Sequence, residues 1–172
     1  LNPSAIFLAS ETSNGYEQAK LLDFQFEFIQ GGDPQFTNIL SSHPAYLAPE
    51  QIILEDEYQI DQKTDLYSLG IILYELLAGR PPFYGSPQEL LDDQLLATPP
   101  NLSEVKPDEW SPLLEEFLQK ALSKDSSERP QNAETFLREC DAALHAQAEL
   151  RYNAQDFEEI EQEIKKLKAE KQ

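Results

Sequence analysis

Apolar residues are most concentrated in one short stretch of the chain, residues 66–78. They recur at steps of three and four residues and also fill much of the opposite face, which predicts a helix buried on nearly every side. Asp65 would cap its start, Gly79 would end it, and Pro81-Pro82 would prevent its continuation. A stretch of about 13 residues is too short to cross a bilayer, which takes about 20. We therefore expect a central helix around which the other elements pack.

The residues before this helix alternate between β-like stretches and turn formers. Residues 1–8 contain a turn and a short strand, and residues 19–28 contain a second strand. Ser13-Asn14-Gly15 between them is typical of a tight turn, so the three parts predict a small hairpin. Residues 30–42 are polar and rich in turn formers, which predicts an exposed loop. Residues 44–53 include a short helix with a proline in its first turn.

The residues after the central helix are predicted to be mainly helical. The pattern indicates three further helices, over residues 87–97, 112–122 and 132–150. Ser86 and Glu89 form a capping-box pattern at the start of the first, and Ser111 would cap the second. Residues 98–107 contain several prolines and are predicted to be a loop.

The end of the chain, residues 149–172, has a pattern of its own. Its apolar positions recur at alternating steps of three and four residues between Glu and Lys, at Phe157, Ile160, Ile164 and Leu167. This predicts an amphipathic helix, although a seam of about two to three heptads is short for an independent coiled coil. Two alternatives stay open: the helix folds back on the domain, or residues 150–172 form a homodimer with those of a second copy.

Composition and charge narrow the classes of partner. The chain has 172 residues, of which 40% are hydrophobic, enough for one domain of ordinary size and an appendage. Its formal net charge of −19 would be repelled by nucleic acid and by anionic membranes, so we expect neither as a partner. The same charge is also typical of the solvated surface of a soluble protein.

Cysteine content and the lack of targeting segments predict the compartment. Cys140 is the one cysteine, so no disulfide can form within the chain, which suits a reducing compartment. Neither a signal peptide nor a membrane segment is indicated, and we expect a cytoplasmic protein. Because the sequence lacks methionine and begins within a structured-looking segment, we expect it to be a fragment of a longer protein.

Few residues have the spacing of a metal or hydrolase site. His43 and His145 are far apart and lack neighbouring Cys or His, so a zinc site is not indicated. Ser68 lies in the predicted central helix without a Gly-x-Ser-x-Gly pattern, which argues against hydrolase chemistry. Cys140 is expected to face the core.

An ordered set of motifs resembles the C-terminal lobe of eukaryotic-type Ser/Thr protein kinases, most closely the bacterial ones. The motifs are Asp23-Phe24-Gln25, Pro44-Ala45-Tyr46-Leu47-Ala48-Pro49-Glu50-Gln51, Asp65-Leu66-Tyr67-Ser68-Leu69-Gly70, Gly79-Arg80-Pro81-Pro82-Phe83 and Lys124-Asp125-Ser126-Ser127-Glu128-Arg129-Pro130. The resemblance covers roughly residues 1–145 and implies a mainly α kinase-like C-lobe over residues 1–148. That lobe would have a small β-hairpin, a central buried helix and a C-terminal helical extension.

The resemblance assigns structural roles to three residues. Glu50 and Arg129 are similar to the family's buried ion pair, in which loss of one partner costs about 3–5 kcal/mol. Asp65 matches an aspartate that binds the backbone of the catalytic loop, although a simple helix cap would also explain it. The positions that hold the fold together are therefore all retained.

The positions tied to chemistry differ from the family's pattern. If residues 1–8 align with the end of the catalytic loop, Asn2 replaces a lysine and Ala5 replaces the asparagine that binds the second Mg²⁺. Gln25 replaces the glycine after Asp-Phe, and His43 replaces a threonine that links the activation segment to the catalytic base. Asp23 alone remains as a candidate metal ligand. Active family members use ATP and Mg²⁺, but we expect no cofactor for this chain.

This contrast favours a pseudokinase C-lobe that acts as a protein-interaction or allosteric module. Its expected contact surfaces are the loop over residues 30–42, the helix over residues 87–97 and the C-terminal tail. Thr37, Ser41 and Ser42 lie where kinases are often phosphorylated and are candidate modification sites, although exposed loop hydroxyls are common.

Two other functions stay open at this point. The parent could be an active Ser/Thr kinase, since the catalytic base, the Gly-rich loop and the phosphate-binding lysine would all precede Leu1. Alternatively, the tail makes the chain a dimerising adaptor with the lobe as a spacer.

Overall fold

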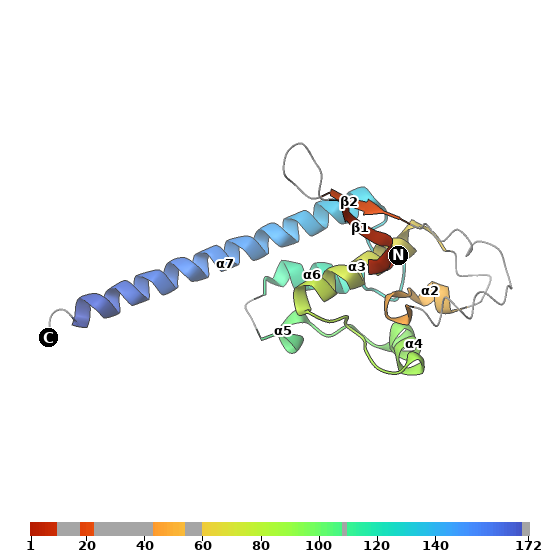
Figure 1. The fold of residues 1–172 in the computed structure, drawn as a ribbon, viewed down its shortest axis with the longest axis horizontal. Helices are drawn as coiled ribbons and strands as arrows, with labels where there is room; N and C mark the ends of the chain where they lie inside the picture. The colour runs from red at the N-terminus through yellow and green to blue at the C-terminus, as the bar shows by residue number, and fades with distance from the viewer. Residues whose placement is uncertain (10–17, 23–42, 54–59, 108–109, 170–172) are drawn as a thin grey trace.

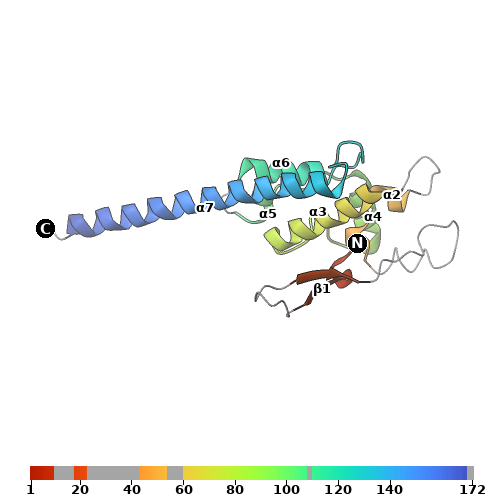
Figure 2. The same ribbon diagram turned by 90° about the horizontal axis from the view of Figure 1, so that it is seen from above.

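The computed structural model describes residues 1–9, 18–22, 43–53, 60–107 and 110–169, with the backbone alone over residues 153–169. It is mainly helical, with one two-stranded sheet (Figure 1). A central helix lies between a pair of helices on one side and the hairpin on the other (Figure 2). The predicted mainly α fold with a small β-hairpin and a central helix is therefore confirmed.

The central helix, α3 (Gln62–Ala78), begins one turn earlier than the sequence predicts. Asp61 is the N-cap: its carboxylate accepts from the backbone N–H of Lys63 at 2.7 Å, and Thr64 Oγ1 accepts from the Asp61 N–H at 3.3 Å. Asp65 lies in the first turn, so the prediction that it caps the helix is wrong. The end is as predicted, because Gly79 adopts a left-handed φ of 80° and closes the last turn.

The core forms where α3 meets α6 (Pro112–Ala121) and α7 (Ala133–Ala169). Tyr67, Ile71 and Tyr74 of α3 are almost wholly buried. Gly70 allows the close approach to α6: a Cβ there would lie 3.1 Å from the Leu122 side chain. The remaining apolar side chains of the core are mainly those of Leu114, Phe117, Leu118, Ala121, Leu122, Phe136 and Ala143.

The N-terminal hairpin follows a single 3-10 turn, η1 (Pro3–Ala5). Strands β1 (Ile6–Ala9) and β2 (Gln18–Leu21) pair antiparallel, with Ile6 opposite Leu21. The predicted turn at residues 13–15 and the predicted strand residues after 22 lie outside the described residues.

The segments on either side of α3 mostly match the predicted pattern. Before it come η3 (Pro44–Tyr46) and the predicted short helix α2 (Pro49–Ile52). After it comes α4 (Pro87–Leu96), capped by Ser86 as predicted.

A short helix, α5 (Leu102–Val105), lies within the segment predicted to be a loop, so that prediction is wrong there. The Glu115 carboxylate accepts from the N–H groups of Leu102 and Ser103 at 2.9 and 3.1 Å. Its cap therefore comes from another helix, which local sequence does not reveal.

Helix α7 runs unbroken over 37 residues, through the position where the pattern of the tail begins. Its first half packs on α6, and its second half extends away from the rest of the described chain (Figures 1 and 2). Despite this length, none of the helices in the described ranges is apolar enough to cross a membrane.

Candidate functional site

Glu50 of α2 and Arg129, in the turn before α7, form a buried ion pair. Arg129 Nη1 and Nη2 donate to Glu50 Oε1 and Oε2 at 2.7 and 2.8 Å. Only 1% of Arg129 and 6% of Glu50 is exposed. Two residues far apart in sequence thus join α2 to the last turn before α7 through a bidentate contact.

Further hydrogen bonds satisfy both charged groups. Thr64 Oγ1 donates to Glu50 Oε1 at 2.8 Å. Arg129 Nε donates to the carbonyl of Ser123 at 2.7 Å, and Nη2 donates to that of Lys124 at 3.1 Å. Burial alone would raise the pKa of Glu50, but the hydrogen bonds and positive charge of Arg129 outweigh it and hold that pKa below its usual value. We call these residues the Glu50–Arg129 clamp.

Asn2, Ala5 and His43, which the resemblance aligns with positions tied to chemistry, gather around η1. The side chain of Asn2 is buried and accepts from the N–H of Ser4 at 2.9 Å, which caps the turn. His43 Nε2 lies 3.3 Å from Ser4 Oγ. Ala5 is buried, and its carbonyl accepts from the N–H of Leu22 at 2.7 Å. We call Asn2, Ser4, Ala5 and His43 the η1 site.

The η1 site lies beside the residue that precedes Asp23, because Leu22 is bonded to Ala5. Asp23 and Gln25 themselves lie outside the described residues, as do the candidate phosphorylation sites Thr37, Ser41 and Ser42. Over the described ranges, no group of three or more His, Cys, Asp or Glu side chains could hold a metal ion.

Asp65 faces the start of the chain and not the clamp. Its Oδ1 lies 3.3 Å from the backbone nitrogen of Leu1, and its side chain is exposed. The carboxylate therefore reaches the segment that the resemblance aligns with the end of the catalytic loop.

The segment next to His43 is held by α3 and α4. Tyr46 Oη donates to Glu75 Oε2 at 2.7 Å, and burial followed by this hydrogen bond raises the pKa of Tyr46. Ser68, expected to lie buried without hydrolase geometry, donates to the Tyr46 carbonyl at 2.8 Å. Gln94 Nε2 donates to the Ala45 carbonyl at 2.6 Å. We call residues 43–46 the anchored segment.

Sequence reasoning missed Gln94 and Lys124, which are both buried or partly buried polar groups. Gln94 also accepts from Tyr67 Oη at 2.6 Å, and Lys124 Nζ donates to Tyr67 Oη at 3.0 Å. The signal for Gln94 was its place four residues after Leu90, on the apolar side of α4. Lys124 is named in the sequence only as the first residue of the motif that contains Arg129, with no role of its own.

The other singled-out residues show no reactive grouping. His145 lies on α7 beside Asp141, far along the chain from His43. Cys140 is partly buried against the core, and this burial raises the pKa of its thiol.

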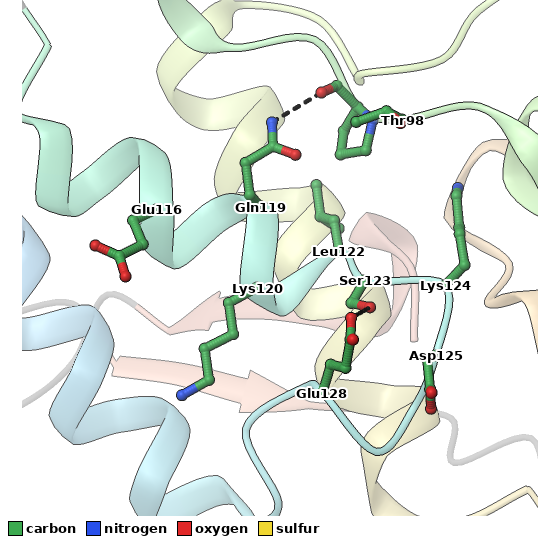
Figure 3. Close-up of a pocket in the computed structure, with 10 residues that line it drawn as sticks. Thr98, Glu116, Gln119, Lys120, Leu122, Ser123, Lys124, Asp125 and Glu128 are labelled. Carbon is green, nitrogen blue, oxygen red and sulfur yellow. Dashed lines mark hydrogen bonds between the residues drawn. The ribbon is translucent and has the colours of Figure 1, made fainter.

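An open cleft of about 620 Å³ lies between the end of α6, the turn before α7 and the Thr98-Pro99 segment (Figure 3). Its polar groups are largely bonded to the protein: Gln119 Nε2 donates to the Pro99 carbonyl at 2.8 Å, and Ser123 Oγ donates to Glu128 at 2.7 Å. Lys124 forms one wall, while Lys120, paired with Glu139, lies across the cleft. This arrangement does not converge on a ligand.

Comparison with known proteins agrees with the fold and the motifs. The family model described as "Protein kinase domain" matches residues 1–140. Serine/threonine-protein kinase pkn2 of Myxococcus xanthus is 34% identical over 153 residues, covering 85% of this chain and 18% of that protein. Serine/threonine-protein kinase TIO of Arabidopsis thaliana is 38% identical over 111 residues, covering 64% of this chain and 8% of that protein.

A solved structure gives the same picture. The crystal structure of the Mycobacterium tuberculosis PknI kinase domain matches with a TM-score of 0.55 and 26% identity, over 83% of this chain and 45% of that chain. The chain thus spans less than half of that kinase domain and a fifth or less of the two curated relatives.

Proposed function

The chain belongs to the protein kinase domain family, and from that premise we propose that it is the C-lobe of a pseudokinase, which binds another protein and does not transfer phosphate. The observation that carries this proposal is Ala5. The resemblance aligns it with the asparagine that binds the second Mg²⁺, and it is buried with its carbonyl bonded to Leu22.

The chemistry of Mg²⁺ supports this proposal. Mg²⁺ requires oxygen ligands in near-octahedral geometry, and the methyl side chain of Ala5 provides none. The nearby side-chain oxygen of Asn2 is already engaged by the N–H of Ser4. Asn2 and Ala5 thus stabilise the η1 turn and offer few oxygen ligands to a metal–phosphate complex.

The surface formed by α4 and the anchored segment supports binding of a protein partner. Leu96, at the end of α4, is 84% exposed, and Glu89 and Asp92 are exposed on the same helix. A partner with basic residues around an apolar side chain would match this surface and the net charge of −19. We further propose a cytoplasmic location, where Cys140 would stay reduced.

The test is nucleotide binding and phosphotransfer by the full-length parent. We expect Mg·ATP to leave its melting temperature unchanged within about 1 °C and to transfer no label to protein hydroxyls. An Ala5→Asn variant of the parent serves as the matched control, because it restores the missing side-chain oxygen. Phosphotransfer by the unmodified parent would overturn the proposal.

A second candidate is that the chain is part of an active Ser/Thr kinase, using ATP and Mg²⁺. The observation in its favour is the 34% identity to a protein named as a Ser/Thr kinase, together with the intact clamp. The residues that precede Leu1 in the parent discriminate: a His-Arg-Asp triplet and an upstream Gly-rich loop and lysine would favour this candidate.

A third candidate is a dimerising adaptor. It is favoured by α7, whose second half extends away from the lobe with the heptad-like pattern of residues 150–172. Light scattering of the chain with and without these residues decides: a dimer that becomes a monomer on truncation supports it. An unchanged monomer mass in both excludes it.

A further inference from the structure

Four residues form a continuous line of hydrogen bonds through the lobe. Lys124 Nζ donates to Tyr67 Oη at 3.0 Å, Tyr67 Oη donates to Gln94 Oε1 at 2.6 Å, and Gln94 Nε2 donates to the Ala45 carbonyl at 2.6 Å. The line begins at the wall of the cleft (Figure 3), passes through α3 and α4, and ends in the anchored segment.

The two middle members are shielded from water. Tyr67 and Gln94 are both 0% exposed. Each of them accepts one hydrogen bond and donates the next, so all the bonds point the same way. In a buried chain of this kind each bond polarises the next, and a charge at the donor end strengthens every bond after it.

The surroundings of Lys124 include groups that favour its positive charge and groups that oppose it. Its ammonium lies 4.3 Å from the centre of the Phe83 ring, and it also donates to the Asp93 carbonyl at 3.1 Å. Burial, followed by the positive charge of Arg129, lowers the pKa of Lys124 to about 7, against the opposing effect of the Asp93 carboxylate. The groups that face Lys124 are thus Tyr67 of α3, Asp93 of α4 and Arg129 of its own turn, with Glu50 behind Arg129.

We propose that Lys124, Tyr67 and Gln94 form a relay through which the charge on Lys124 sets how firmly the anchored segment is held. The relay would regulate the protein-binding surface of α4 and the anchored segment, so its role rests on the proposed function. When Lys124 is protonated, the bond from Gln94 to Ala45 is strengthened. When Lys124 loses its proton, that bond weakens and the segment opens more often.

The first experiment removes the middle of the relay and measures amide hydrogen exchange in the free chain. The backbone N–H groups of Tyr46 and Leu47 report on the anchored segment, because they donate to its His43 and Pro44 carbonyls. Tyr67→Phe removes the hydroxyl that joins Lys124 to Gln94. We expect both amides to exchange about tenfold faster in this variant, relative to amides of α6 in the same sample.

A matched control lies on the same helix. Tyr74 is also almost wholly buried, and its hydroxyl donates to the Pro100 carbonyl at 3.0 Å, outside the relay. Tyr74→Phe should change exchange of the two reporter amides less than twofold. Equal effects of the two variants would overturn the relay, because they would show only a general loss of stability.

The second experiment follows the same amides against pH. After correction for the intrinsic exchange rate, their protection should fall about threefold with a midpoint near pH 7. The change should be absent in Lys124→Met and present in Lys120→Met, which alters a lysine on the far side of the cleft. All three proteins carry His43→Gln, so that no imidazole lies in the anchored segment. A pH profile that survives Lys124→Met would overturn the proposal.

These experiments use the free chain without a partner, so their result is independent of the test of the proposed function. A partner that binds α4 although the exchange tests fail would leave the function standing without the relay. If the exchange tests succeed but the parent transfers phosphate, the relay is supported and the pseudokinase proposal is wrong.

Discussion

The Glu50–Arg129 clamp and the η1 site lie in the same lobe but are built in opposite ways. The clamp joins residues distant in sequence. Its two charged groups bond each other, and Thr64 and the Ser123 carbonyl supply further hydrogen bonds. The η1 site is held by a local cap at Asn2, by the backbone hydrogen bond from Leu22 to Ala5 and by one 3.3 Å contact between Ser4 and His43. The two regions therefore differ in burial and in the number of bonds: the charged groups of the clamp are buried and bonded several times, whereas the side-chain contacts of the η1 site are few and more exposed.

The energetic difference follows from burial. A charge removed from water must be compensated within the protein, so loss of one partner in the clamp leaves the other without solvation. The contact between Ser4 and His43 is exposed, and water can replace either partner. The two regions should consequently respond to substitution by very different amounts.

The largest effect is expected from Arg129→Ala. It leaves the Glu50 carboxylate buried without its cation, and should lower the free energy of unfolding by about 3–5 kcal/mol. Urea denaturation measures the change, and Glu50→Gln provides a milder variant if the first does not fold. Lys120→Ala, which breaks a partly exposed pair with Glu139, is the control and should cost under about 1 kcal/mol. Equal losses of unfolding free energy in Arg129→Ala and Lys120→Ala would contradict the expected difference between buried and exposed contacts.

The next effect is the pH dependence caused by Lys124, the second cation beside the clamp. Its pKa is about 7 in the folded chain, whereas an unfolded lysine holds its proton until about pH 10.4. Between these values the unfolded state binds more protons, so stability should rise with pH. We expect a gain of about 1–2 kcal/mol from pH 7 to pH 10, allowing for the solvent that reaches the side chain. Denaturation at several pH values should show this slope in the unmodified chain and not in Lys124→Met.

A smaller effect is expected where the two regions meet, at the anchored segment. Ser68 is fully buried and donates to the Tyr46 carbonyl. Ser68→Ala removes that donor and should cost about 1 kcal/mol. Thermal unfolding measures it, and Ser127→Ala, at an exposed position in the turn before α7, should be near neutral. A neutral Ser68→Ala would mean that the segment is held by Tyr46 and Gln94 alone.

The smallest effect is expected at the η1 site itself. Ser4→Ala and His43→Gln each remove one side of an exposed contact, and should change stability by less than about 0.5 kcal/mol. The pair combined should be additive within the same limit. A cost above about 2 kcal/mol for either would show that this site carries structure as the clamp does.

The sequence predicted the clamp better than its surroundings. Glu50 and Arg129 stand within motifs whose order identifies the lobe, and they are in contact in the structure. Gly79 was predictable because a left-handed residue at a helix end favours glycine. In both cases the signal is carried by the residue type at a fixed position.

Features that depend on a distant partner were not predictable. Helix α5 begins where Glu115 of α6 caps it. The start of α3 is different, because the partner of its N-cap Asp61 is Thr64, only three residues further along the chain. Gln94 and Lys124 have ordinary surface residue types, and only packing makes them internal. Whether Asp23 lies beside Ala5 falls outside the described residues.

Helix α7 also has a mechanical consequence. At about 1.5 Å per residue, its 37 residues form a rod of roughly 55 Å, of which roughly 33 Å lies beyond Gln147. A rotation of about 10° where the rod is seated on α6 would sweep its tip through roughly 6 Å, by the same rise per residue. A force applied to that tip would in turn exert a torque on α6 and the first half of α7, the helices that pack against α3.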